Sequence, residues 1–155
     1  MKIRFRLNGR WVETEVAPTE RALDLLRDRL GVLSVKEGCG EGECGACSIL
    51  YNGQQVLSCL LPAVHLEDAE VWTAEGLQNH PVAKAFLEED ALQCGFCTPG
   101  FLVAAFAYVV QGGSEDPEAI REALSSNLCR CTGYVHILRA VQRAVREHHA
   151  SHSRE

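Results

Sequence analysis

Eight cysteines divide into two groups of four along the chain, and thiolate side chains are the usual ligands of iron–sulfur clusters. The first group, Cys39, Cys44, Cys47 and Cys59, has the spacing C-x4-C-x2-C-x11-C. This spacing is the plant-type ferredoxin pattern for a [2Fe–2S] cluster. The glycine-rich stretch EGCGEGECGAC (37–47) lets the backbone wrap closely and turn its N–H groups toward cluster sulfurs. The first group therefore predicts a [2Fe–2S] site.

The second group, Cys94, Cys97, Cys129 and Cys131, has the different spacing C-x2-C-x31-C-x-C. Cys94 and Cys97 precede a predicted helix that opens with Thr98-Pro99, and the other two precede the last predicted helix. Two helix N-termini, each with about half a positive charge, would then face an anionic cluster. We interpret this group as a second [2Fe–2S] site.

Other chemistries for these cysteines fit the spacing less well. Structural zinc is the nearest alternative, but zinc ribbons place two C-x2-C pairs about 15–20 residues apart. Here 46 residues separate Cys47 from Cys94. The CGFC stretch at 94–97 resembles a thioredoxin motif without the βαβ surroundings of one. The glycines of 40–45 match G-x-G-x-x-G, but a dinucleotide fingerprint follows a strand and opens a helix, so we reject that interpretation.

Composition narrows the class of protein further. The 155 residues are 46% hydrophobic and 23% charged, with a net charge of −6, which favours a globular protein and disfavours nucleic acid as a partner. The longest apolar run, 101–110, is about half of the roughly 20 residues that a membrane span needs. No apolar segment follows the basic N-terminal residues, so we expect a cytoplasmic protein and reduced thiols. No catalytic residue is predicted.

Residues 1–76 are predicted to form a ferredoxin-like [2Fe–2S] domain of the β-grasp type, in an α+β protein. The pairs Asn8-Gly9 and Asn52-Gly53 each lie between alternating apolar segments and predict two β-hairpins. A helix of about 11 residues is expected between the hairpins, with Thr19 as its N-cap and Gly31 after its last turn. A further short strand is expected at 71–73.

Beyond residue 76 the pattern is helical. The predicted helices are 81–89, 99–111, 117–125 and 135–148, and three of them carry proline near the first position. Asp116 is a candidate cap for the third helix. The sequence thus predicts a small four-helix-bundle [2Fe–2S] domain at 77–148. A polar tail at 149–155 is expected to be disordered.

Three stretches carry a resemblance to a known family. EGCGEGECGACSIL (37–50), QCGFCTPG (93–100) and NLCRCTGYVHI (127–137) resemble the small iron–sulfur subunit of the xanthine oxidase family of molybdenum hydroxylases. The likeness covers residues 1–147. It implies an electron-transfer subunit of a multi-subunit oxidoreductase, with no complete catalytic site in this chain.

The resemblance also implies partners and site residues. A large molybdopterin-binding subunit and a medium FAD-binding subunit would complete a hetero-oligomer, and electrons would pass from molybdenum to the second cluster, the first cluster and FAD. Gln93 would hydrogen-bond the pterin, and Cys131 would lie against it. Purine or N-heterocycle oxidation is the expected reaction of the whole enzyme.

A free-standing ferredoxin-like electron shuttle is the main alternative function. It shares the cluster chemistry and lacks obligate partner subunits. A structural zinc protein and a thiol oxidoreductase are further alternatives.

Overall fold

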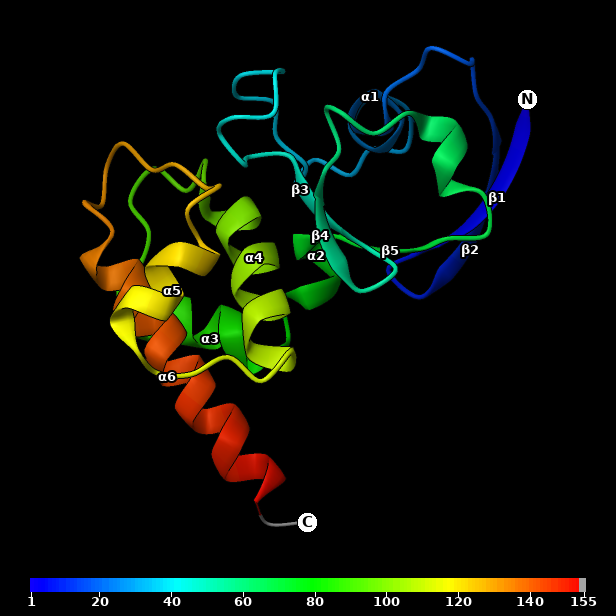
Figure 1. Cartoon of the computed structure of the whole chain (residues 1–155). Helices are drawn as coiled ribbons and strands as arrows, with labels where there is room; N and C mark the ends of the chain where they lie inside the picture. The colour runs from blue at the N-terminus through cyan, green and yellow to red at the C-terminus, as the bar shows by residue number, and fades with distance from the viewer. Residues whose placement is uncertain (154–155) are drawn as a thin grey trace.

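The computed structural model describes residues 1–153, with a mixed β-sheet in the first half and helices in the second (Figure 1). The five strands are ordered β2-β1-β5-β3-β4. Their bounds are β1 Lys2–Leu7, β2 Arg10–Glu15, β3 Ser48–Tyr51, β4 Gln54–Leu57 and β5 Glu70–Trp72. β5 joins the two hairpins, because it pairs parallel with β1 and antiparallel with β3. The predicted α+β class is confirmed.

Both predicted hairpin turns form. Asn8 and Asn52 each have φ 49°, and the following Gly9 and Gly53 have φ 85° and 83°. Positive φ at both central residues matches the right-handed twist of the flanking strands, and asparagine followed by glycine adopts it readily. These turns set the register in which β1 pairs with β2 and β3 with β4.

The helix between the hairpins differs from its prediction at the start. It comprises α1 (Ala22–Asp24) and the wider-turned η1 (Leu25–Arg29), so it begins three residues after Thr19. Arg21 occupies the N-cap position without a side-chain cap, and the Thr19 prediction is wrong. The position of this helix is set by burial of Leu23, Leu25 and Leu26 against the sheet, and not by a hydroxyl that caps its first turn. Gly31 ends it with φ +70°, as predicted.

All four predicted helices are present in the second half (Figure 1). They are α3 (Pro81–Glu88), α4 (Thr98–Val110), α5 (Pro117–Ala123) and α6 (Val135–His152). Asp116 caps α5 through the backbone N–H of Glu118. The short α2 (Ala74–Leu77) and η2 (Ala63–Leu66) were not predicted. The predicted boundary between residues 76 and 77 falls within α2 and stays a prediction.

The predicted polar tail is partly wrong, because α6 continues through His152. Its buried apolar face ends earlier, at Val145, and polar contacts such as the hydrogen bond from Ser151 Oγ to the His148 carbonyl, at 2.9 Å, accompany the helical hydrogen bonds of the last turn. The rest of that tail includes residues 154–155, which lie outside the described residues.

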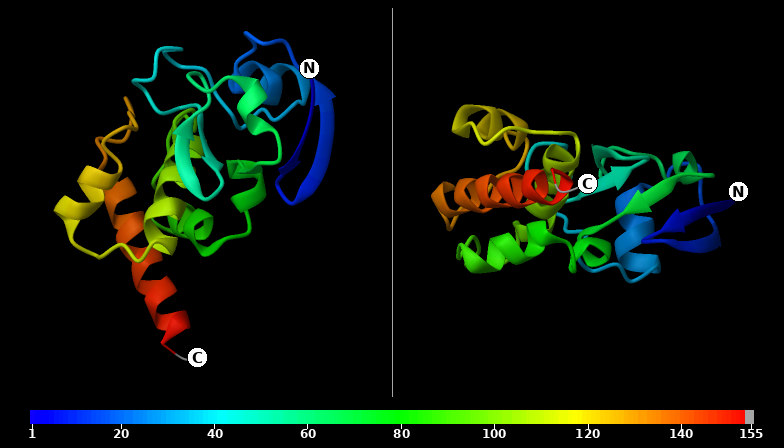
Figure 2. Two further views of the ribbon diagram at one scale, coloured as in Figure 1. Left: turned by 45° about the vertical axis from the view of Figure 1, so that its right-hand side comes forward. Right: turned by 90° about the horizontal axis from the view of Figure 1, so that it is seen from below.

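Each half has its own core, and a third, smaller core joins them. Leu50, Leu77, Val103 and Ala107 pack together at this junction, with Trp72 and Phe106 against them. The helices therefore lie directly beside the sheet (Figure 2). Among residues 1–153, no helix is both long and apolar enough to cross a membrane.

Candidate metal centres

The loop of residues 36–47 gathers backbone N–H groups around one sulfur. Cys39 Sγ accepts N–H groups from Glu41 at 3.4 Å, Glu43 at 3.3 Å and Cys44 at 3.4 Å. These donors, with Glu41 first, lower the pKa of Cys39 to about 7, because they stabilise the thiolate. The N–H of Cys39 in turn points at Cys44 Sγ, at 3.4 Å. The loop is thus shaped to hold negatively charged sulfur.

Cys47 and Cys59 complete the first group from the sheet side. Both are buried, Cys47 just before β3 and Cys59 just after β4. Burial, followed by contact with the Cys47 thiol, raises the pKa of Cys59 to about 11. Metal ligation requires the thiolate, so binding at this pair must release protons. Gly38 leaves room for the loop to close, since a Cβ there would lie 2.6 Å from Cys44 Sγ.

The second group is built from two loops of the helical half. The sulfurs of Cys94 and Cys131 lie 3.6 Å apart, and Cys97 contacts Cys129. Burial, followed by that contact, raises the pKa of Cys97 to about 12. Burial opposes ionisation of Cys129. Hydrogen bonds from the hydroxyl and N–H of Thr132, at 3.2 and 3.4 Å from its sulfur, together with those from Cys97 and Cys131, outweigh burial and lower the pKa of Cys129.

Two helices begin at the second group, as predicted. α4 starts at Thr98, directly after Cys97, and α6 starts at Val135 after the Cys129–Cys131 loop. Tyr134, with φ 72°, turns the chain into α6, and its hydroxyl accepts the N–H of Cys129 at 3.1 Å. The positive ends of both helix dipoles therefore lie close to these sulfurs.

Gln93 and Cys131 lie together in the structure. Gln93 Nε2 donates to the Cys131 carbonyl at 3.1 Å, and both residues are exposed. Their predicted contact with a pterin stays a prediction.

The two cysteine groups are neighbours. A cavity of about 450 Å³ is lined by Gly38 and Cys44 from the first loop and by Cys97 and Cys129 from the second group. The N–H of Leu128 donates to the Cys44 carbonyl at 3.0 Å. In Figure 1 the loop of 36–47 (cyan) and the loop of 128–134 (orange) lie along the same upper edge of the molecule.

The sulfur contacts come in pairs. Within residues 1–153, no three metal-binding side chains are grouped to hold a single metal ion. A [2Fe–2S] cluster requires pairs of thiolates, because its four thiolate ligands are divided between two iron atoms, two for each iron. The pairs Cys39/Cys44, Cys47/Cys59, Cys94/Cys131 and Cys97/Cys129 fit that requirement.

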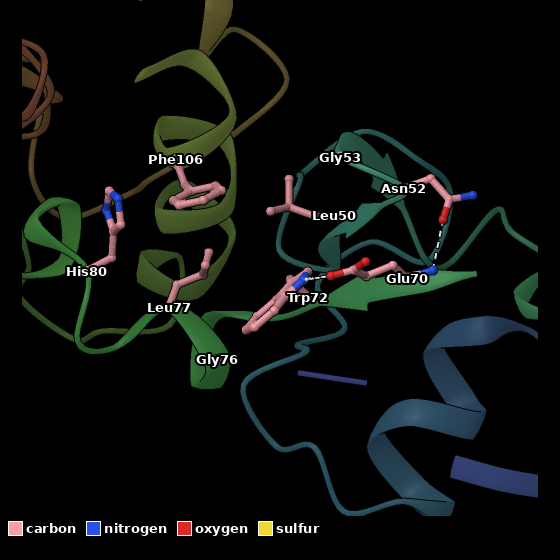
Figure 3. Close-up of a pocket in the computed structure, with 9 residues that line it drawn as sticks. All are labelled: Leu50, Asn52, Gly53, Glu70, Trp72, Gly76, Leu77, His80 and Phe106. Atoms are coloured by element: carbon pink, nitrogen blue, oxygen red, sulfur yellow. Dashed lines mark hydrogen bonds between the residues drawn. The ribbon is translucent and has the colours of Figure 1, made fainter. Parts of the chain in front are cut away.

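A separate pocket of about 660 Å³ contains no cysteine. It lies between the sheet and the helices and is lined by Trp72, Leu77, His80 and Phe106, among others (Figure 3). Trp72 Nε1 donates to Glu70 at its rim, at 2.9 Å. The pocket is separate from both cysteine groups.

Asn127 is a buried polar residue that the sequence did not single out. It belongs to the predicted loop before Cys129, where asparagine is common and carries no distinctive signal. Its side chain contacts Gly45 and Gln55 of the first half, residues that no local pattern connects to it.

Known proteins share both halves of this chain. A family model described as a 2Fe-2S iron-sulfur cluster binding domain matches residues 5–76, and a [2Fe-2S] binding domain model matches residues 73–142. The nicotinate dehydrogenase small FeS subunit of Eubacterium barkeri is 43% identical over 147 residues, covering 92% of this chain and 94% of its own. A probable xanthine dehydrogenase subunit of Bacillus subtilis (strain 168) is 40% identical over 149 residues, covering 94% of this chain and 86% of its own.

A solved structure agrees in fold as well as sequence. Quinoline 2-oxidoreductase from Pseudomonas putida 86 contains a chain that matches with a TM-score of 0.87 and 37% identity, covering 95% of this chain and 96% of that one. This chain belongs to the small iron–sulfur subunits of the xanthine oxidase family. The small iron–sulfur subunit is part of an oxidoreductase and has two [2Fe–2S]-binding domains. These matches argue against a structural zinc protein and against a thiol oxidoreductase.

Proposed function

We propose that this small iron–sulfur subunit relays electrons from a molybdopterin site in a large subunit to FAD in a medium subunit. The observation that carries the proposal is the 3.0 Å hydrogen bond from the Leu128 N–H to the Cys44 carbonyl. It joins the two cysteine groups directly, because Cys44 belongs to the first and Leu128 precedes Cys129 of the second.

The paired cysteines are the proposed ligands. Cys39 and Cys44 would hold one iron of the first cluster, and Cys47 and Cys59 the other. Cys94 with Cys131, and Cys97 with Cys129, would hold the irons of the second. Such clusters supply one-electron chemistry over a wide range of potentials, roughly −700 to +450 mV. The chain's own contribution is to orient backbone N–H groups and helix N-termini toward the sulfurs.

Exposed apolar side chains near each cysteine group support a partner surface there. Phe96, Leu128 and Tyr134 are exposed large apolar side chains close to the second group, and Gln93 is exposed beside Cys131. Such clustered apolar exposure is typical of a protein interface. We therefore assign this surface to the large subunit, where Gln93 and Cys131 would meet the pterin.

The first cysteine group faces a different surface. Cys39 is exposed in the loop of 36–47, and Leu60, next to Cys59, is an exposed apolar residue. We assign this surface to the flavin subunit, at the other end of the relay.

The proposed substrate of the whole enzyme is an N-heterocycle. The relatives described above are named for nicotinate, quinoline and xanthine, all of them nitrogen-containing ring compounds. Oxidation of such compounds by the assembled enzyme is the expected result. A cytoplasmic location is part of the same proposal.

Anaerobic co-purification with the proposed partner subunits tests the relay. We expect a stable complex with about four iron and four sulfide per small subunit, as two [2Fe–2S] clusters require, and two distinct EPR signals after reduction. A monomer that carries both clusters and never associates with a larger subunit would support the shuttle alternative. A chain with zinc in place of iron would contradict both.

A further inference from the structure

The polar contact between the two halves centres on the side chain of Asn127. This side chain is only 3% exposed, and both ends of its amide are used. Asn127 Nδ2 donates to the Gly45 carbonyl at 3.1 Å, and its Oδ1 accepts from Gln55 Nε2 at 3.2 Å. Both partners belong to the sheet-containing half. A buried amide satisfied across a junction holds the two sides in one arrangement.

Two glycines close the space around this amide. A Cβ on Gly45 would lie 2.6 Å from Asn127 Nδ2, and a Cβ on Gly100 of α4 would lie 3.1 Å from the same atom. The Gly100 Cβ would also clash with the Gly45 carbonyl. Neither glycine therefore has room for an added methyl group, so the two halves are in direct contact here.

The amide contact is adjacent to the hydrogen bond between the cysteine groups. Gly45 follows Cys44, and Asn127 precedes Leu128, so two neighbouring residues on each side form the two bonds. We propose that Asn127 is a positioning residue that sets the separation, and hence the electronic coupling, of the two clusters. This inference rests on the proposed function, because it requires both clusters.

Loss of the amide should leave each half intact. The Gly45 carbonyl also accepts from the N–H of Ser48 at 3.2 Å and from its hydroxyl at 2.7 Å. Gln55 Nε2 has a second acceptor in Ser48 Oγ, at 3.1 Å. An Asn127→Ala variant therefore leaves neither partner without a hydrogen bond. Besides the two hydrogen bonds across the junction, it removes the local one from Ser126 Oγ to Asn127 Oδ1, at 3.4 Å.

EPR spectroscopy of the reduced full chain tests the positioning role. In the wild type we expect two [2Fe–2S] signals with a resolved spin–spin interaction between the clusters. Asn127→Ala should keep its iron content and both signals and lose the resolved interaction. Val103→Ala, in the apolar part of the junction, is the matched control, which should lower the melting temperature and keep the interaction.

Gly100→Ala tests the junction from the other side. Alanine favours a helix more than glycine does, so helix propensity alone would make Gly100→Ala at least as stable as the wild type. Any harmful effect of the substitution must therefore come from the clash. We expect loss of the spin–spin interaction, as in Asn127→Ala, because the new methyl group pushes against the Gly45 carbonyl.

Several outcomes would overturn the positioning role. An unchanged interaction in both variants would do so, as would two non-interacting signals in the wild type. Loss of a cluster from Asn127→Ala would assign that residue to cluster binding or folding instead. A wild-type chain with fewer than two [2Fe–2S] signals would overturn the proposed function itself, and this inference with it.

Discussion

The contacts of individual cysteine sulfurs show which cysteines lie together as pairs. Their spacing alone separates two groups of four, and the structure then resolves each group into two pairs. The pairing was not predictable, because Cys47 and Cys59 meet only after a hairpin forms. The role of Asn127 was not predictable either, because its hydrogen-bond partners lie more than 70 residues away in the sequence.

Serine substitutions should separate the two sites. Cys44→Ser is expected to remove the first cluster and spare the second, because no residue of the 94–131 group depends on the Cys44 sulfur. Cys129→Ser should do the reverse, and each variant is the control for the other. Iron analysis and EPR spectroscopy of the reduced variants check this. Equal loss of both signals in either variant would contradict two independent sites.

Replacing Gln93 should affect the link to the large subunit without affecting the clusters. Gln93 contacts the backbone of Cys131 and no sulfur, so Gln93→Ala should keep both EPR signals and full iron content. Reduction of the clusters by substrate in the assembled enzyme should slow by about tenfold, the equivalent of about 1.4 kcal/mol. Gln78→Ala, outside both cysteine groups, is a control. Loss of a cluster from Gln93→Ala would indicate a folding role.

At the scale of elements, turns were more predictable than helix ends. Asparagine–glycine pairs encode both hairpin turns locally, and proline and Asp116 mark helix starts through their own backbone chemistry. The start of α1 depends instead on how its leucines pack on the sheet, which no local signal near Thr19 reports. The extra turn at the end of α6 lies beyond the apolar face of the helix, so the apolar periodicity could not predict it.

The start of α3 gives the protein a pH-dependent contact. His80 caps this helix, with Nδ1 accepting the N–H of Val82 at 3.2 Å, which requires an unprotonated nitrogen. Burial first, and then the nearby His148, lower the pKa of His80 from its usual 6.5. The unfolded chain therefore takes up this proton more readily, so the stabilisation is complete above pH 6.5 and declines as the pH falls below it.

His80→Asn is the variant that tests this contact. Asparagine is a good N-cap and does not titrate, so the helix start is kept while the pH dependence is removed. Between pH 7.5 and pH 5.5, the melting temperature of the wild type should fall more than that of His80→Asn. Thermal melts monitored by circular dichroism measure this difference. Equal falls in the two proteins would show that His80 does not contribute.

At the scale of the whole molecule, four of the eight cysteines contribute to the cores of the two halves. Cys47 and Cys59 are members of the first core, and Cys97 and Cys129 pack against the second. Each predicted domain has about 75 residues, a size at which an apolar core alone is marginal and a metal centre adds needed stability. The clusters are therefore expected to contribute to folding as well as to electron transfer.

Cluster removal tests this contribution. Protein stripped of iron under reducing conditions should melt at a lower temperature and over a broader range than the loaded protein. Calorimetry of the two forms, followed by reconstitution with iron and sulfide as a control for irreversible damage, measures the effect. A cluster-free chain that melts as sharply and at the same temperature as the loaded one would contradict it.

The C-terminal end of α6 is a suitable place to attach an affinity peptide. His152 ends a helix that points away from the edge on which the cysteine loops lie (Figure 1). An affinity peptide fused beyond this helix would leave that edge facing bulk solution when the protein is immobilised on a resin. Purified large and medium subunits could then be added one at a time to the captured chain, so that the order of assembly could be followed directly.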